Sequence, residues 1–96
     1  MLFEWDEEKN AANIAKHGIG FKTACRIFEG KVVTAIDERF DYGEVRFNSI
    51  GVIAEIVFLV VTHTDREGRT RIISARPAKQ RERQRYVQAI QQGTGS

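Results

Sequence analysis

The chain has 96 residues, a length that fits a single domain with a small core. With 42% hydrophobic and 29% charged residues its composition is that of a soluble globular protein, and no apolar run approaches the roughly 20 residues that cross a bilayer. The formal net charge is only +2, and the acidic start MLFEWDEEKN excludes an ordinary secretory signal peptide, so we expect a cytoplasmic protein that binds no membrane.

The first predicted elements are a short strand over 3–5 and a helix over 6–18. Asp6 is a suitable N-cap for this helix, and Gly18 can adopt the left-handed conformation that ends it. A second, shorter helix is predicted over 20–30, because apolar residues recur there at helical spacing. The only cysteine, Cys25, lies on that apolar stripe and cannot form an internal disulfide, so we expect it to pack as a small apolar residue.

From Lys31 onward β-branched and aromatic residues dominate, and four strands are predicted over 32–37, 44–53, 56–64 and 69–76, with a turn at 41–43. The continuous apolar run 56–64 is typical of a central, buried strand.

Pro77 ends the last of these strands and suits the first turn of a helix over 78–90. The predicted fold is therefore α+β: a short N-terminal strand, two helices, a four-stranded antiparallel meander and a C-terminal helix. We expect one domain over 1–92 and a frayed tail over 93–96.

Charge is distributed unevenly along the chain. Eight basic and two acidic residues lie between Arg66 and Arg85, a local balance of +6, whereas the rest of the chain carries −4. Such a basic segment is suited to bind a polyanion, although a solvated, arginine-rich helix face would have the same composition.

Three segments together resemble the BrnT-type toxins of bacterial type II toxin–antitoxin systems: FEWDEEKNAANIAKHGIGF, GEVRFNSIG and TDREGRTRIISARPAKQRERQRY. The resemblance implies a RelE-like fold and a metal-independent endoribonuclease that arrests growth by cutting RNA. It also implies a ribbon-helix-helix (BrnA-type) antitoxin that neutralises the toxin, and a toxin–antitoxin complex that binds operator DNA through the antitoxin and represses its own operon. Two features depart from the family pattern: GVIAEIVF lacks a glycine-bearing turn, and Pro77 stands where a basic residue is more usual.

Cleavage of RNA without a metal requires a base for the 2′-hydroxyl, cations for the transition-state charge and an acid for the leaving oxygen. Arg66, Arg71 and Arg76 are the candidate cations, because a guanidinium binds phosphate bidentately and keeps its charge. The resemblance ranks Arg66 and Arg76 highest. Strict strand alternation places Arg71 and Arg76 on opposite faces, so either Arg76 swings round the strand end or one of them forms an ordinary salt bridge.

His17 is the candidate proton carrier, because its ordinary pKa lies near neutrality. In the last turn of a helix it could equally serve as a partner of the helix dipole, and the neighbouring Lys16 could bind phosphate or be solvated. His63 lies in the predicted central strand, where a packing role is favoured.

In the last helix Glu82 and Tyr86 fall on one stripe with Ala78 and Ile90. Glu82 could orient an active-site arginine, act as a base or anchor the helix to the sheet, and Tyr86 could stack on a base or pack. Four further basic residues are expected to hold the RNA backbone: Lys79, Arg81, Arg83 and Arg85.

The sequence contains no H-E-x-x-H, C-x-x-C pair, P-loop or G-x-S-x-G motif, so we expect neither a metal site nor a cofactor. Two alternatives to a ribonuclease stay open on these residues: a non-catalytic nucleic-acid-binding module, and a degenerate toxin that acts only as an antitoxin partner.

Overall fold

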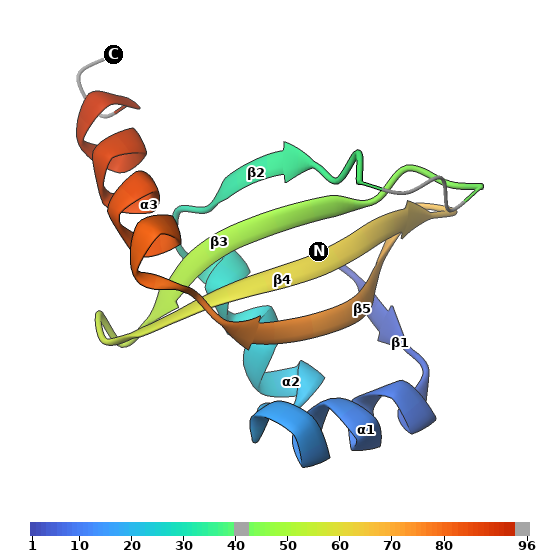
Figure 1. Cartoon of the computed structure of the whole chain (residues 1–96). Coiled ribbons are helices and arrows are strands. Elements are labelled where there is room, and N and C mark those ends of the chain that lie inside the picture. Colours follow the sequence, from blue (N-terminus) through green and yellow to red (C-terminus); the bar gives the residue numbers. More distant parts are fainter. Residues whose placement is uncertain (40–42, 94–96) are drawn as a thin grey trace.

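The structure is a computed structural model that describes residues 1–39 and 43–93. Helices α1 (Glu7–His17) and α2 (Phe21–Ala24) lie on one side of a sheet, and α3 (Gln80–Gly93) lies at one end of its other side (Figure 1). The α+β class is confirmed. The predicted turn falls partly, and the frayed tail mostly, outside the described residues.

The sheet has five strands in the order β1-β5-β4-β3-β2. Their bounds are β1 Phe3–Trp5, β2 Val33–Ile36, β3 Phe47–Ile53, β4 Val57–Arg66 and β5 Arg69–Pro77. The last four form the predicted antiparallel meander, but β1 pairs parallel to β5, which makes the sheet mixed. The predicted antiparallel meander is thus only part of a mixed sheet, and the parallel pair was not predicted because pairing between the two ends of the chain leaves no local sequence signal.

Both ends of α1 are formed as predicted. The Asp6 side chain accepts hydrogen bonds from the backbone N–H groups of Glu8 and Lys9, and Gly18 adopts a φ of 72°. The predicted second helix is divided, since α2 continues as a 3₁₀ helix, η1, over Cys25–Glu29. The 3₁₀ geometry is a tighter winding that proteins use in short pieces at helix ends.

The β3–β4 hairpin turns without glycine. Ala54 and Glu55 both take left-handed backbone conformations, with φ of 53° and 62°, and Ile56 N–H donates to the Ile53 carbonyl. Strand pairing continues in register up to Ile53 opposite Val57. The missing glycine in GVIAEIVF therefore leaves the register intact, at the cost of unfavourable φ values.

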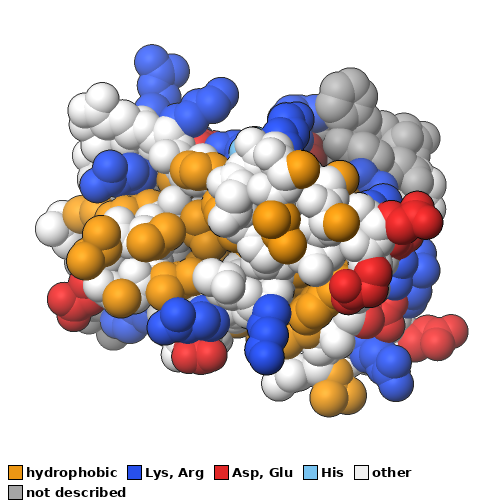
Figure 2. Space-filling model, turned by 90° about the horizontal axis from the view of Figure 1, so that it is seen from below, with side chains coloured by type: hydrophobic (Ala, Val, Ile, Leu, Met, Phe, Trp, Pro, Cys, Tyr) orange, Lys and Arg blue, Asp and Glu red, His pale blue; other side chains and the backbone are white. Residues whose placement is uncertain are grey.

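The core lies between the sheet and the helices below it. Phe21, Ala24 and Ile27 are fully buried against Val61 and Ala75. Gly51 permits close approach of η1, because a Cβ at this position would lie 2.7 Å from Ile27 Cβ. The helix-covered face carries hydrophobic side chains across its surface, while most lysines and arginines lie around its rim (Figure 2).

His63 belongs to this core. Its Nε2 lies 2.8 Å from Ser49 Oγ, which in turn lies 2.7 Å from Thr34 Oγ1. The ring stacks on Phe47 and meets the Phe28 ring edge to face. Burial lowers the pKa of His63, which is consistent with the predicted packing role.

Asn13 joins α1 to the outer edge of β5, beyond the point where β1 ends. Its Nδ2 donates to the carbonyls of Ile19 and Ala75, at 2.8 Å each, and its Oδ1 accepts from the Ala75 N–H at 3.1 Å. The side-chain amide thus satisfies both backbone groups of Ala75 that a neighbouring strand would otherwise pair.

Candidate functional site

The face of the sheet opposite α1 and α2, here called the open face, carries the arginines of β4 and β5. A β-bulge in β5 allows them to share it. Thr62 pairs with Ser74 but His63 pairs with Ile72, so Ile73 is an extra residue in β5. The extra residue changes the alternation, and Arg71 and Arg76 lie on the same face, opposite Thr64 and Val60. The prediction that they occupy opposite faces was wrong for this reason.

Arg76 is held by a carboxylate of α3. Its Nη1 and Nη2 each donate to one oxygen of Glu82 at 2.8 Å, and Nη1 also lies 3.3 Å from the Pro77 carbonyl. Glu82 is fixed in turn by the Lys79 N–H, which donates to Oε1 at 2.8 Å. Among the described residues, no hydrogen bond is found from Arg76 Nε. The edge of the guanidinium formed by Nε and Nη2 therefore remains open to a ligand.

The low pKa of Glu82 argues against one of its predicted roles, that of a base. The hydrogen bonds from Arg76 lower the pKa of Glu82 to about 2. Such a carboxylate is a weak proton acceptor at neutral pH, so Glu82 is unsuited to be the general base. Its contacts fit the orienting and anchoring roles.

A second arginine on this face, Arg39, was not singled out from the sequence. Its Nε and Nη2 donate to the two oxygens of Asp37 at 2.9 Å each, and its backbone N–H donates to Oδ1 at 3.2 Å. The Asp37 side chain is 1% exposed and that of Arg39 is 67% exposed. These hydrogen bonds lower the pKa of Asp37 to about 2. The available sequence signal was an aspartate that ends a strand, two residues before an arginine.

Polar side chains cross the open face between these two ion pairs. Asn48 hydrogen-bonds to Asp37 and accepts from Thr62 Oγ1 at 2.6 Å. Thr62 pairs with Ser74, which lies two residues before Arg76 on the same face. A continuous polar strip thus leads from Asp37 to Arg76.

The other predicted arginines lie toward the far end of the face. Arg71 Nη1 donates to Glu4 at 2.8 Å, and Arg66 lies 3.6 Å from Glu44. Arg66 pairs with Arg69 next to the β4–β5 turn, while Arg76 pairs with Val60. Six residues of β4 therefore separate Arg66 from the position of Arg76, about 20 Å at roughly 3.3 Å per residue. The structure does not bring Arg66 and Arg76 together at one phosphate.

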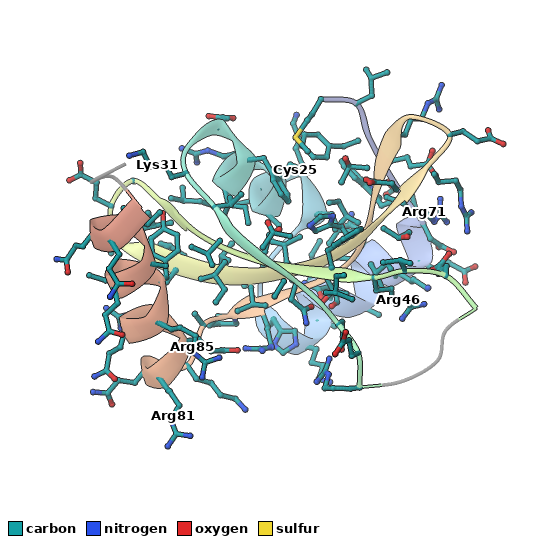
Figure 3. The ribbon with its side chains drawn as sticks, turned by 90° about the horizontal axis from the view of Figure 1, so that it is seen from above. Cys25, Lys31, Arg46, Arg71, Arg81 and Arg85 are labelled. Atoms are coloured by element: carbon teal, nitrogen blue, oxygen red, sulfur yellow. The ribbon has the colours of Figure 1, made fainter. Side chains whose placement is uncertain are left out.

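The basic residues of α3 do not share one surface. Arg81 and Arg85 extend from the same side of the helix, and Arg46 and Arg71 lie toward the opposite end of the sheet (Figure 3). Arg83 projects about 200° around the helix from both Arg81 and Arg85 and covers the Phe58 ring at 4.7 Å. The prediction that Lys79, Arg81, Arg83 and Arg85 hold the RNA backbone stays a prediction, with Arg83 on a different side of α3 from Arg81 and Arg85.

Tyr86 packs instead of facing a ligand. It is 7% exposed, meets the Phe58 ring edge to face, and donates its hydroxyl to the Lys31 carbonyl at 2.8 Å. Burial raises the pKa of its hydroxyl. Of the two roles predicted for Tyr86, the structure shows packing.

His17 and Lys16 end α1, on the side of the sheet opposite the open face (Figure 1). His17 is half-buried and follows Asn13 by one helical turn, and Asn13 holds Ala75, the residue before Arg76. This arrangement places the end of α1 beside the edge of β5. Lys16 is exposed.

Residues 1–39 and 43–93 contain neither a metal-binding cluster nor a membrane-spanning helix. They contain no group of three histidine, cysteine, aspartate or glutamate side chains that could hold a metal ion. They also contain no helix that is long and apolar enough to cross a membrane. Burial raises the pKa of Cys25 to about 11.

Comparisons with known proteins agree on one family. Residues 5–82 match the family "Ribonuclease toxin, BrnT, of type II toxin-antitoxin system". The fold is similar to the crystal structure of the Brucella abortus ribonuclease toxin BrnT, with 25% sequence identity and a TM-score of 0.63; the match covers 83% of this chain and 100% of that one. No curated protein sequence matches the chain.

Proposed function

The chain belongs to the BrnT family of ribonuclease toxins from type II toxin–antitoxin systems, and on that premise we propose that it is a metal-independent endoribonuclease whose scissile phosphate binds at Arg76. The observation that carries this proposal is the open Nε and Nη2 edge of Arg76, presented on the open face while Glu82 occupies the other edge. The proposed toxin domain is the single unit 1–92, with a RelE-like fold, acting in the cytoplasm.

The ion pair explains how Arg76 would stabilise the reaction. A guanidinium carries two pairs of parallel donors, and each pair matches the spacing of two oxygens on a carboxylate or phosphate. Glu82 fixes the plane of the guanidinium through one pair, so the other pair is oriented before RNA arrives. Donors that are already oriented need no reorganisation as charge develops in the transition state.

The proton transfers require other groups. Glu82 and Asp37 are both weak bases, because hydrogen bonds from arginine lower the pKa of each to about 2. His17 is therefore our candidate proton carrier, with Lys16 as a nearby cation. His17 ends α1 beside the edge of β5, on the side of the sheet away from Arg76, so its proposed role requires the RNA to pass round that edge. Arg71 is assigned to RNA binding at the far end of the face, with Arg81 and Arg85 at the near end.

The antitoxin partner follows from the family. We propose a ribbon-helix-helix antitoxin that neutralises the toxin and, in complex with it, binds operator DNA and represses the operon. The arginines of the open face would attract an acidic segment of such a partner, as they would attract RNA.

The test is cleavage of a defined naked RNA by the purified protein in EDTA. Wild type is expected to give fragments with cyclic phosphate or 3′-phosphate ends, and Arg76→Ala is expected to lower the rate by about 10² to 10³. Arg26→Ala, which removes the same charge from η1 on the helix-covered side, should cut like wild type. A folded wild-type protein that binds RNA and leaves it whole would instead favour the non-catalytic binding module.

A further inference from the structure

Two arginines on the open face are each held by a separate carboxylate that the chain supplies. Arg76 is held by Glu82 and Arg39 by Asp37, in both cases through two hydrogen bonds of 2.8 to 2.9 Å. The two pairs lie far apart in the sequence, since Asp37 follows β2 and Arg76 lies in β5. The fold therefore creates this cluster.

The Arg39 pair is unusual for a surface ion pair. An exposed pair contributes roughly 0 to 1 kcal/mol to stability, and it needs no buried partner. Here the Asp37 side chain is 1% exposed, while its arginine is 67% exposed. Burial of a carboxylate is unfavourable unless its oxygens are hydrogen-bonded. The observed arrangement restricts the motion of an exposed guanidinium, as a preorganised anion receptor requires.

The polar strip of Asn48, Thr62 and Ser74 connects the two pairs. The positive charge of Arg39 is close enough to lower the pKa of Arg76, against the larger opposite effect of Glu82. Two cations held within range of each other repel, and an anion bound between them removes that repulsion. RNA supplies such anions in a row along its backbone.

We propose that Arg39 is a second phosphate-binding residue, which holds an RNA backbone phosphate next to the one at Arg76. This inference rests on the proposed function for the identity of the ligand. It extends that function by assigning the path of the RNA across the polar strip, from Arg76 in β5 toward the end of β2.

The experiment measures binding of a 2′-O-methyl RNA oligonucleotide, which cannot be cut by attack of the 2′-hydroxyl, over a range of salt concentrations. The slope of log K against log salt is negative, and loss of one phosphate contact makes it less steep by about 0.7 for a single strand. Arg39→Ala is expected to show this smaller slope and roughly tenfold weaker binding. Arg39→Lys should keep the slope, because the lysine charge also neutralises a phosphate.

Two controls accompany these variants. Arg26→Ala removes one positive charge from the helix-covered side and should keep the wild-type slope. Because Arg39→Ala leaves the buried Asp37 without its partner, the double variant Asp37→Asn with Arg39→Ala is measured too; it contains no orphaned charge and should show the same smaller slope.

Failure of this inference and failure of the proposed function are distinguishable. If the folded Arg39→Ala protein and the double variant bind with the wild-type slope and affinity, Arg39 holds no phosphate, whether or not wild type cuts RNA. If the slope falls as expected but wild type leaves naked RNA whole, the phosphate site stands and the ribonuclease proposal fails.

Discussion

Replacement of Glu82 by alanine removes both hydrogen bonds to Arg76 and the one from the Lys79 N–H. The pKa of Glu82 is about 2, against an ordinary 4.5. At about 1.4 kcal/mol for each pH unit, this difference sets an upper limit of roughly 3 to 4 kcal/mol on the stabilisation. Since the Arg76 and Glu82 side chains are 36% and 23% exposed, solvent screening reduces the expected loss to about 1 to 2 kcal/mol.

The pH dependence of this loss has a definite sign. Because the folded-state pKa of Glu82 is lowered, its contribution is fully present above about pH 4.5 and disappears as the pH falls toward 2. Urea unfolding of wild type and Glu82→Ala at pH 7 and at lower pH should therefore show two stability curves that converge on acidification.

Activity provides the decisive readout for a positioning role. Glu82→Ala should lower kcat for RNA cleavage by more than tenfold with a smaller effect on KM, because a mobile Arg76 can still attract RNA but is no longer oriented for the transition state. Glu82→Gln, which can still accept a hydrogen bond, should lie between alanine and wild type. A Glu82→Ala protein that loses stability as expected yet cleaves at the wild-type rate would show that Glu82 does not position Arg76 for catalysis.

Two further predictions concern the core. Burial lowers the pKa of His63, so stability should fall as the pH drops below about 6.5, where the unfolded chain takes up a proton. A non-titrating His63→Leu variant should show a flatter curve of melting temperature against pH between about pH 5 and 7. An equally steep curve would show that His63 is not the source of this pH dependence. Gly51→Ala should cost about 1 to 3 kcal/mol, since the new methyl would lie 2.7 Å from Ile27 Cβ; chemical denaturation measures the loss, and an unchanged midpoint would show that η1 can shift.

Much of this fold could be predicted from local sequence signals. Asp6 and Gly18 defined the first helix because caps depend on neighbouring residues alone. The meander was visible in the composition of its strands. The pairing of β1 with β5 was not visible, since Phe3 and Thr70 meet only through the folded chain.

The candidate site was harder to predict because it depends on side-chain direction. Alternation is a rule with a period of two, and the single extra residue Ile73 inverts it for every position that follows in β5. The family motif singled out Arg76 as a candidate, but nothing in the sequence alone indicated the bulge that puts it on the same face as Arg71. Arg39 was missed because the burial of Asp37 and its hydrogen bond to Asn48, from a different strand, exist only in the folded chain.

The Asn13 amide has a consequence for how this protein meets other chains. Exposed backbone along a sheet edge can recruit a strand from another molecule, and proteins commonly block such edges. At Ala75 the block is a single side chain from a helix, which occupies both the N–H and the carbonyl. No strand is needed to block this part of β5, because the Asn13 side chain already occupies its backbone groups. A partner or an aggregating copy would have to join the sheet elsewhere.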